Sequence, residues 1–263
     1  MNYKFDNVEH VHTINGEPLC GTSTVMGVAA KVLTWWAAGL AVQELGWTPK
    51  KDEDGNSVDR GLRMIQAHKR LEEIKPMSGE EYLDLLDKAY AAHSKSLKDS
   101  ATAGTDLHAE AEKWVKSVMD LKEIDPHPRI KPFVAWCKEN VEGFLYSEIH
   151  CYSIKMWTGG ISDCGAWLKN GKRVVFDFKS SKEVYPSQLF QAAGYAMQLA
   201  ENGGFDAQGN KKLDPFMADD CAVVPFGGKS IPVFSGEMET IKEGFLGALA
   251  LYKATERMKK VLK

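Results

Sequence analysis

Three charged residues stand out in the stretch 159–195, because the residues around them are largely apolar. Asp177 and Lys179 lie two positions apart in the run 173–179, and Asp163 lies upstream in a second apolar segment. Strand geometry turns residues two apart to the same face, so Asp177 and Lys179 would point the same way. Burying a carboxylate and an ammonium costs free energy unless each finds a partner. The pattern therefore indicates a functional site built on two strands.

The turn between these strands decides whether Asp163 joins the site. A two-residue Asn-Gly hairpin would pair Asp163 with Phe178, which points to the opposite face. A three-residue loop at 169–171, with Gly171 in the left-handed region, pairs Asp163 with Asp177 instead. A slip of one residue exchanges the two faces, so the registers exclude each other unless a bulge intervenes. We expect the loop, or a bulge, that brings the aspartates together.

Two carboxylates a few ångströms apart repel unless a cation lies between them or one is protonated. An all-oxygen site with few ligands suits Mg²⁺ or Mn²⁺, and such ions clamp phosphate oxygens. The acid pair therefore predicts a divalent-metal site that acts on phosphate.

The elements that would position this site predict an α/β (α+β) fold. We expect a single domain over 1–263, with a helical N-terminal part at about 22–121, a core around a small central mixed sheet at about 145–235, and a C-terminal helix at about 236–261. The predicted helices cover about 22–45, 61–74, 79–97, 103–121, 130–145, 186–203 and 236–261. The predicted strands cover about 148–157, the segment around Asp163, 173–179, 221–225 and 231–234.

Several local features accompany these elements. A cap by the residues 22–24 would begin the first helix, and Thr105 or Asp106 would cap a later one. The tryptophans 35–36 are expected in the core rather than as base-stacking residues. The polar segment 49–60 predicts an exposed loop.

Two helix faces carry further candidates. His108 and Glu112 lie four apart, hence on one face, although a lone histidine near a helix start is more often structural than a ligand. Gln188, Gln191 and Tyr195 form one polar stripe on the helix that Pro186 begins. Plain surface is the simpler interpretation of such a stripe.

Composition bounds the class of protein. The chain has 263 residues, 44% hydrophobic and 26% charged, and a formal net charge of −3. The net charge therefore does not indicate a nucleic-acid partner, and any basic surface must be local. The five cysteines are scattered without C-x₂-C spacing, which argues against an iron–sulfur cluster, a zinc ribbon or a disulfide framework and favours a reducing cytoplasm. The apolar runs are too short to span a membrane, so no membrane partner is expected.

Taken in order, the strings Gly160-Ile-Ser-Asp163, Asp177-Phe-Lys179 and Gln191-Ala-Ala-Gly-Tyr195 resemble the PD-(D/E)XK nuclease superfamily. D-x-K alone is a weak signal, since Asp120-Leu-Lys122 repeats it on a predicted helix. The combination is similar to the RecB-like exonuclease branch and to small phage-encoded exonucleases. Gly104-Thr-Asp-Leu-His108-Ala-Glu110 and Glu148 look like the upstream motifs of that branch.

The resemblance implies a restriction-endonuclease-like core and a divalent-metal-dependent DNA exonuclease of phage or recombination and repair type. The metal ligands that it implies are His108, Asp163, Asp177 and the backbone carbonyl of Phe178, around Mg²⁺ or Mn²⁺ and without an iron–sulfur cluster. The catalytic residues that it implies are Asp163, Asp177, Lys179, Gln191, Tyr195 and Glu148, with Glu148 also a candidate ligand. DNA ends would be the substrate, with little sequence preference because backbone phosphates carry no sequence information. A homo-oligomer and a recombination or single-strand-annealing partner are compatible with it.

Two other classes stay open. One is an endonuclease on the same fold, and the other is a non-catalytic DNA-binding or assembly module. The intact acids and lysine argue against the second, whereas the net negative charge fits a protein that does not bind DNA slightly better than a nuclease.

Overall fold

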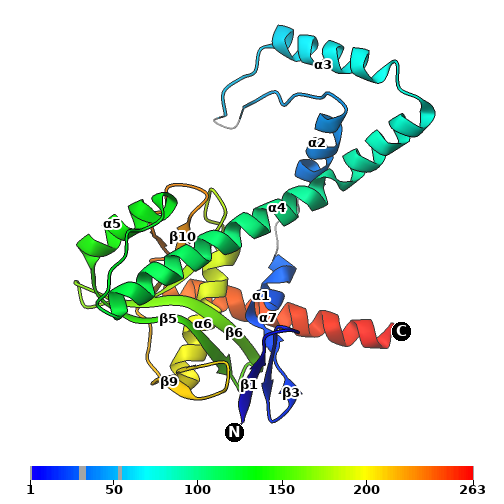
Figure 1. Ribbon diagram of the computed structural model, residues 1–263. Coiled ribbons are helices and arrows are strands. Elements are labelled where there is room, and N and C mark those ends of the chain that lie inside the picture. Colours follow the sequence, from blue (N-terminus) through cyan, green and yellow to red (C-terminus); the bar gives the residue numbers. More distant parts are fainter. Residues whose placement is uncertain (1, 30–33, 53–54, 263) are drawn as a thin grey trace. The chain divides into compact units, whose positions relative to one another are not determined.

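The computed structural model describes residues 2–29, 34–52 and 55–262, without the side chains of 34–36 and 97–106. The chain divides into two compact units (Figure 1). The first, here the core unit, comprises 1–30 and 103–263, and the second, here the helical unit, comprises 31–102. All of the predicted site residues belong to the core unit. Whether the whole chain behaves as a single domain stays a prediction.

A mixed central sheet forms the middle of the core unit. In the described part of the chain it has eight strands in the order β11-β10-β7-β6-β5-β8-β9, with β4 paired to β6 outside this path. Its longer strands are β5 (Val141–Ser153), β6 (Thr158–Leu168), β7 (Arg173–Lys179) and β10 (Asp220–Pro225). Its short strands are β4 (Cys20–Gly21), β8 (Gly204–Phe205), β9 (Lys211–Leu213) and β11 (Val233–Phe234). β10 runs parallel to β7 and β4 parallel to β6, whereas the other pairs are antiparallel.

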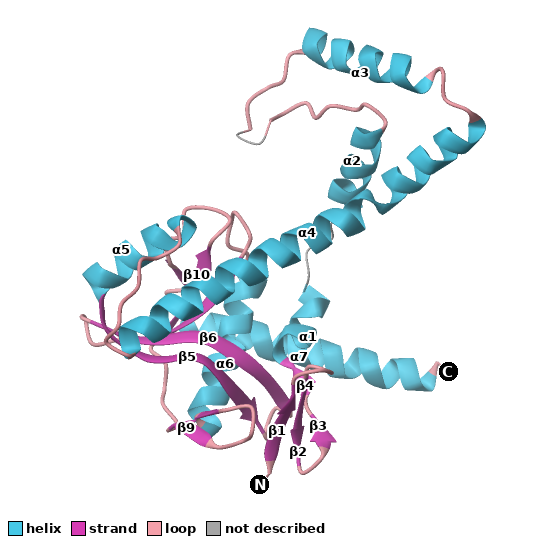
Figure 2. Ribbon diagram, in the orientation of Figure 1, coloured by secondary structure: helices cyan, strands magenta, loops and turns pink. Residues whose placement is uncertain are grey.

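Helices cover both faces of this sheet, which confirms the predicted mixed α/β class (Figure 2). The second part of α4 (Gly79–Met119), from Leu107 onward, and α5 (Lys131–Asn140) pack on one face, and α6 (Pro186–Asn202) and α7 (Met238–Val261) on the other. The alternation of β7 explains this layering. Phe176 and Phe178 join the cluster with Trp114 and Phe133, while Val175 joins the cluster with α6.

A second, smaller sheet lies near the N-terminus. Its strands are β1 (Tyr3–Asp6), β2 (Val11–Ile14) and β3 (Glu17–Pro18), all antiparallel. Tyr3 and Ile14 pack against Tyr152 of β5, so this sheet is attached to the edge of the larger core.

The β6–β7 turn has the predicted three-residue loop. The N–H of Leu168 donates to the carbonyl of Lys172 at 2.8 Å, and Gly171 has φ +83°. Pairs such as Cys164 with Phe176 continue the same register. The observed pairing ends at Cys164 and Phe176, and the same register continued by one position would place Asp163 opposite Asp177.

The N-terminal cap was predicted wrongly. α1 (Thr22–Met26) begins at Thr22 itself, and Gly21 is the cap residue without a side-chain hydrogen bond. The Thr22 hydroxyl instead donates to the carbonyl of Gly159 at 3.1 Å, tying the helix to β6. A short 3₁₀ turn (Gly27–Ala29) follows, and the next described helix is α2 (Thr34–Glu44).

The helices predicted at 79–97 and 103–121 are one continuous helix, α4. The backbone at 105–106 is helical, so neither residue begins a helix, and their side chains lie outside the described part. The intervening segment contains no proline, and a single helix glycine, Gly104, costs only about 1 kcal/mol.

The segment between α5 and β6 also differs from the prediction. α5 ends at Asn140, and β5 begins at Val141 rather than near 148. β5 ends at Ser153, so Ile154 and Met156 lie in the turn that follows rather than on the strand. β5 carries two register irregularities before Tyr146, which blur the alternation that the sequence showed.

The helical unit contains α2, α3 (Arg60–Ile74) and the first part of α4. Asp59 caps α3 by accepting a hydrogen bond from the N–H of Leu62 at 3.0 Å. The described residues of the 49–60 loop are mostly exposed, as predicted. The side chains of the tryptophans 35–36 lie outside the described part. None of the helices described here is both long enough and apolar enough to cross a membrane.

Candidate metal and phosphate site

Three carboxylates form a row across neighbouring strands. Asp163 of β6 lies between Glu148 of β5 and Asp177 of β7. The pairs 147–164 and 149–162 bracket the Glu148–Asp163 position, and the β6–β7 register brings Asp177 to the other side. Three acids from three strands therefore meet at one level of the sheet.

Asp163 is held by the neighbouring strand. Its Oδ2 accepts a hydrogen bond from the N–H of Phe178 at 2.6 Å, and its Oδ1 lies 3.9 Å from Nδ1 of His108. Asp163 and His108 line a pocket of about 300 Å³, together with Glu112, Glu148 and Phe178. The metal ligands implied by the resemblance therefore border one cavity, except for Asp177, which lies beside it.

Lys179 and Asp177 form an ion pair within β7, because residues two apart share a face. Nζ of Lys179 lies 2.6 Å from Oδ2 of Asp177, whose side chain is only 2% exposed. The Lys179 ammonium is therefore the partner of this buried oxygen. The site therefore holds a buried carboxylate whose charge is balanced by the lysine two positions along the same strand.

Burial shifts the protonation of these groups. It raises the pKa of Asp177 to about 6, against the lowering effect of Lys179 and with a further rise from Asp163. Burial also raises the pKa of Asp163, while Lys179 and the Phe178 N–H oppose the rise. The two carboxylates in turn raise the pKa of Lys179 despite its own burial. The lysine is thus an ammonium held by nearby acids, and burial opposes the ionisation of both acids.

Glu112 is a site residue that the sequence reasoning did not assign. Its carboxyl forms a hydrogen bond with Glu148 and an ion pair with Lys116 of the same helix. The hydrogen bond from Glu112 is the largest cause that raises the pKa of Glu148, to about 7, ahead of burial. Its position four residues after His108 was the available signal, because that spacing places both on one face of α4.

Glu148 also has an unusual backbone. Its φ is +46°, a left-handed conformation that costs a residue with a Cβ atom. Strain of this kind is concentrated at functional sites. The Glu148 carboxyl forms its hydrogen bond with Glu112 while the flanking residues keep the β5–β6 pairing.

His108 lies 3.9 Å from Asp163 and edge-on to the ring of Phe178, with ring centroids 6.1 Å apart. Burial lowers the pKa of His108, and the Lys179 ammonium lowers it further. A hydrogen bond to the backbone of Phe178 and the charge of Asp177 oppose this shift. A neutral imidazole results, which is the form that binds metals.

The three polar residues of the α6 stripe have two different roles. Nε2 of Gln191 donates to the hydroxyl of Tyr195 at 2.8 Å, and the Tyr195 ring lies against Gly160 of β6. Burial and then the charge of Asp177 raise the pKa of Tyr195. Gln188 instead accepts from the N–H of Tyr185 at 2.9 Å and caps the helix. Gln191 and Tyr195 therefore adjoin the acids, whereas Gln188 is structural.

The donor set suits a cation that keeps part of its water shell. Among the described side chains, no group of three or more His, Cys, Asp or Glu residues is arranged as a complete metal site. Mg²⁺ is usually bound by one or two carboxylates with water and phosphate oxygens completing an octahedron. The carboxylates of Asp163 and Asp177 fit that pattern.

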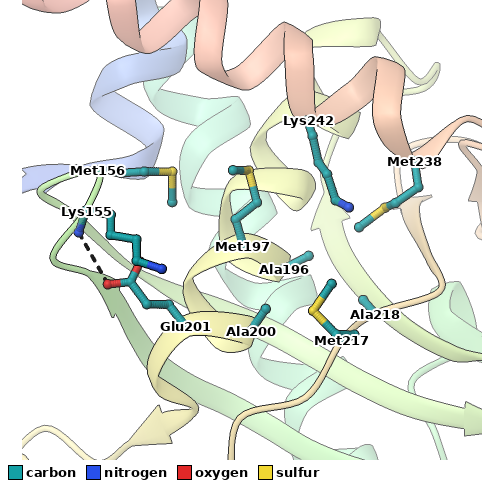
Figure 3. A pocket seen from close by; sticks show the side chains of 10 residues that line it. All are labelled: Lys155, Met156, Ala196, Met197, Ala200, Glu201, Met217, Ala218, Met238 and Lys242. Atoms are coloured by element: carbon teal, nitrogen blue, oxygen red, sulfur yellow. Dashed lines mark hydrogen bonds between the residues drawn. The ribbon is translucent and has the colours of Figure 1, made fainter.

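A different pocket, of about 410 Å³, lies on another face of α6 (Figure 3). Four methionines line it, from α6, α7 and two loops: Met156, Met197, Met217 and Met238. Its only acid, Glu201, accepts hydrogen bonds from Ser153 at 2.6 Å and the Ile154 N–H at 2.9 Å. This apolar pocket offers none of the chemistry of the carboxylate row.

Comparison with known proteins adds no assignment, because neither a protein-family model nor a curated protein matches the sequence.

Proposed function

We propose that this protein is a divalent-metal-dependent deoxyribonuclease of the PD-(D/E)XK type, acting as an exonuclease on DNA ends. The observation that carries the proposal is the arrangement of Asp163, Asp177 and Lys179. Two strands bring the acids together, and Nζ of the lysine lies 2.6 Å from Oδ2 of Asp177.

Asp163, Asp177, the Phe178 carbonyl and His108 would hold Mg²⁺ or Mn²⁺. The ion, when bound, supplies a water of lowered pKa and stabilises charge on the scissile phosphate. The N–H of Phe178 fixes the Asp163 carboxylate, so one of its oxygens stays directed at the pocket.

Lys179 stabilises the negative charge that develops on the phosphate oxygens, because its ammonium is preorganised in a buried site. The Gln191–Tyr195 pair positions the lysine or the DNA backbone. Glu148 and Glu112 share a proton at the opposite side of Asp163, where a second ion or a leaving group would lie.

The test is digestion of end-labelled single-stranded and double-stranded linear DNA, with Mg²⁺, with Mn²⁺ and with EDTA. We expect metal-dependent release of short products from the ends. Activity that survives EDTA would exclude the metal mechanism. Binding of DNA without cleavage under either metal would favour the non-catalytic module.

Covalently closed circular DNA distinguishes the second class of nuclease. An exonuclease leaves the circle intact, whereas an endonuclease on the same fold linearises it. We expect intact circles under conditions that consume the linear form.

Location and partners belong to the same proposal. All five cysteines are free, and four of them are buried, which supports a reducing cytoplasm. DNA ends are the proposed partner, with a recombination or single-strand-annealing protein as a further one.

A further inference from the structure

Two loops leave the carboxyl ends of the parallel strands β7 and β10, beside the candidate site. They are residues 180–183, here the β7 loop, and residues 226–230, here the β10 loop. The N–H of Phe226 donates to the carbonyl of Lys179 at 2.7 Å, so the β10 loop begins next to the lysine of the site. Sheets with parallel strands commonly bind ligands beyond the carboxyl ends of those strands. The two loops therefore occupy a place that can contact a substrate.

The β10 loop lies directly against the β7 loop because it contains two adjacent glycines. A Cβ atom added at Gly227 would lie 2.1 Å from the carbonyl oxygen of Ser180. One added at Gly228 would lie 2.2 Å from the carbonyl oxygen of Lys182. Only glycine permits so close an approach of the two backbones. The contact therefore fixes the backbone of the next residue, Lys229, beside the β7 loop.

A third segment, the short 3₁₀ turn η2 (Pro128–Ile130), is bonded to the β10 loop. Oγ of Ser230, whose side chain lies in a residue only 2% exposed, donates to the carbonyl of Arg129 at 2.8 Å. One N–H of the Arg129 guanidinium donates to the carbonyl of Phe226 at 3.3 Å. A guanidinium has five N–H donors, so Arg129 keeps donors for a further partner. The turn and the loop thus hold Arg129 and Lys229 in one built unit.

The charges of these segments are mostly positive. Residues 127–131, the β7 loop and the β10 loop together contain four basic residues and one acidic residue, Glu183. Arg129 and Lys229 are exposed, and neither forms an ion pair with another residue of the described part of the chain. The whole chain has a net charge of −3, so this excess of positive charge is local. A local basic surface of this kind suits an anionic partner.

We propose that Arg129 and Lys229, here the phosphate clamp, bind backbone phosphates of the DNA strand that lies in the candidate site. The inference rests on the proposed function, because it names how that site holds its substrate. Lys182, which Gly228 contacts, follows Lys179 by three residues, a span of at most about 10 Å. Phosphates follow one another along a DNA strand with a rise of about 3.4 Å. The clamp therefore holds phosphates a few nucleotides from the scissile one, without reading the sequence.

The first test separates binding from turnover. Lys229→Ala should raise KM for linear DNA by about three- to tenfold and leave kcat within about twofold, because the clamp holds the strand away from the reacting phosphate. Arg129→Gln should act in the same way, since glutamine keeps an N–H donor for Phe226 but carries no charge.

Lys172→Ala is the matched control for these variants. Lys172 is exposed and directly precedes β7, so it lies at the end of the strand opposite to the clamp. Its KM and kcat should equal those of the wild type. Wild-type KM in both clamp variants overturns the proposal.

The second test measures DNA binding without cleavage, by fluorescence anisotropy of end-labelled double-stranded DNA in EDTA at several salt concentrations. The logarithm of the binding constant falls linearly with the logarithm of the salt concentration, by about 0.9 for each phosphate neutralised. Each clamp variant should lower this slope by about 0.9, and the double variant by about twice as much. Slopes equal to that of the wild type, and of Lys172→Ala, contradict the clamp.

Failure of the clamp and failure of the nuclease give different results. A wild-type protein that cleaves DNA, with unchanged KM and salt slope in both clamp variants, overturns the clamp and leaves the nuclease. Binding that loses salt dependence in the variants, without cleavage under Mg²⁺ or Mn²⁺, supports the clamp and overturns the nuclease. A protein that neither binds nor cleaves DNA overturns both.

Discussion

The buried ion pair of Lys179 and Asp177 sets the chemistry at the level of single residues. Nζ of Lys179 is 2.6 Å from Oδ2 of Asp177, and the carboxylate is almost fully buried. Removing one member of such a pair leaves an uncompensated buried charge, which is costly unless the group changes its protonation. Asp177 has that option, because its pKa is already raised to about 6.

Lys179→Ala should therefore abolish cleavage without unfolding the protein. We expect a loss of at least about 100-fold in turnover, as for other preorganised charge stabilisers. Asp177 then takes up a proton near neutral pH instead of staying as a bare charge. Turnover of end-labelled DNA and the thermal melting curve measure the two effects.

Lys122→Ala is the matched control, since Lys122 belongs to the second D-x-K string and is exposed. Its turnover at saturating DNA should equal that of the wild type. Equal turnover in the Lys179 variant would remove the lysine from the chemistry.

The left-handed backbone of Glu148 gives a second test at this scale. Glu148→Gly should be more stable than Glu148→Ala by about 1–2 kcal/mol, because only glycine adopts a positive φ without strain. Both variants lose the same carboxylate, so the difference reports the backbone alone. Chemical denaturation measures it.

Ser147 provides the comparison for this pair of variants, because its φ is not positive. Gly at 147 should be less stable than Ala by about 0.5–1 kcal/mol, the usual penalty in a strand. If the glycine variant were less stable than the alanine variant at position 148 as well, the backbone of Glu148 would be unstrained.

At the scale of elements, the α6–α7 contact holds the helix that carries Gln191 and Tyr195. A Cβ atom added at Gly194 of α6 would lie 2.7 Å from Cε2 of Phe245 on α7. Phe245 is fully buried and has no room to move. Close approach of the two helices therefore depends on this glycine.

Gly194→Ala should destabilise the protein by about 1–3 kcal/mol, the usual cost of overpacking a core. It should also lower activity by shifting Tyr195. Gly247→Ala on α7 is the control, because nothing lies within 4 Å of an added Cβ there and the helix should gain up to about 1 kcal/mol. Guanidinium unfolding of both variants measures these changes. A Gly194→Ala variant as stable as the wild type would contradict the close packing of α6 against α7.

The sequence predicted some elements and missed others for physical reasons. The β6–β7 register was predictable, because Gly171 at φ +83° belongs to a specific loop and the alternation of β7 leaves one face for Asp177. The continuity of α4 was not predictable, because a polar stretch that contains glycine fits a loop between two helices equally well. Glu112 was missed because its role depends on Glu148, a contact between a helix and a strand that local spacing does not encode.

At the scale of the whole core unit, the small N-terminal sheet attaches through buried aromatic and histidine side chains. The Tyr3 hydroxyl and Nδ1 of His12 are 2.6 Å apart, and the His12 and His150 ring centroids are 5.8 Å apart. Burial, together with the smaller effects of His150 and His10, lowers the pKa of His12 to about 4. The folded protein therefore keeps His12 in its neutral form.

This shift makes the protein acid-sensitive in a defined window. The unfolded chain protonates His12 below its ordinary pKa of about 6.5, whereas the folded protein resists until about 4. Stability should fall as the pH drops from about 6.5 to 4, by on the order of 3 kcal/mol from this residue.

His12→Gln should flatten that part of the stability profile, measured by urea unfolding at several pH values. The exposed His68, replaced in the same way, should leave the profile unchanged. Equal slopes for wild type and the His12 variant would contradict the role of His12.

The distribution of the five thiols has a practical consequence for following how the protein opens. Cys20 is half-buried and the other four are buried, and burial raises the pKa of every one of them. A disulfide reagent such as dithionitrobenzoate should therefore release about one equivalent of chromophore slowly from the native chain and the full complement at once in denaturant. The colour that develops under intermediate conditions then counts the molecules whose interior has become accessible.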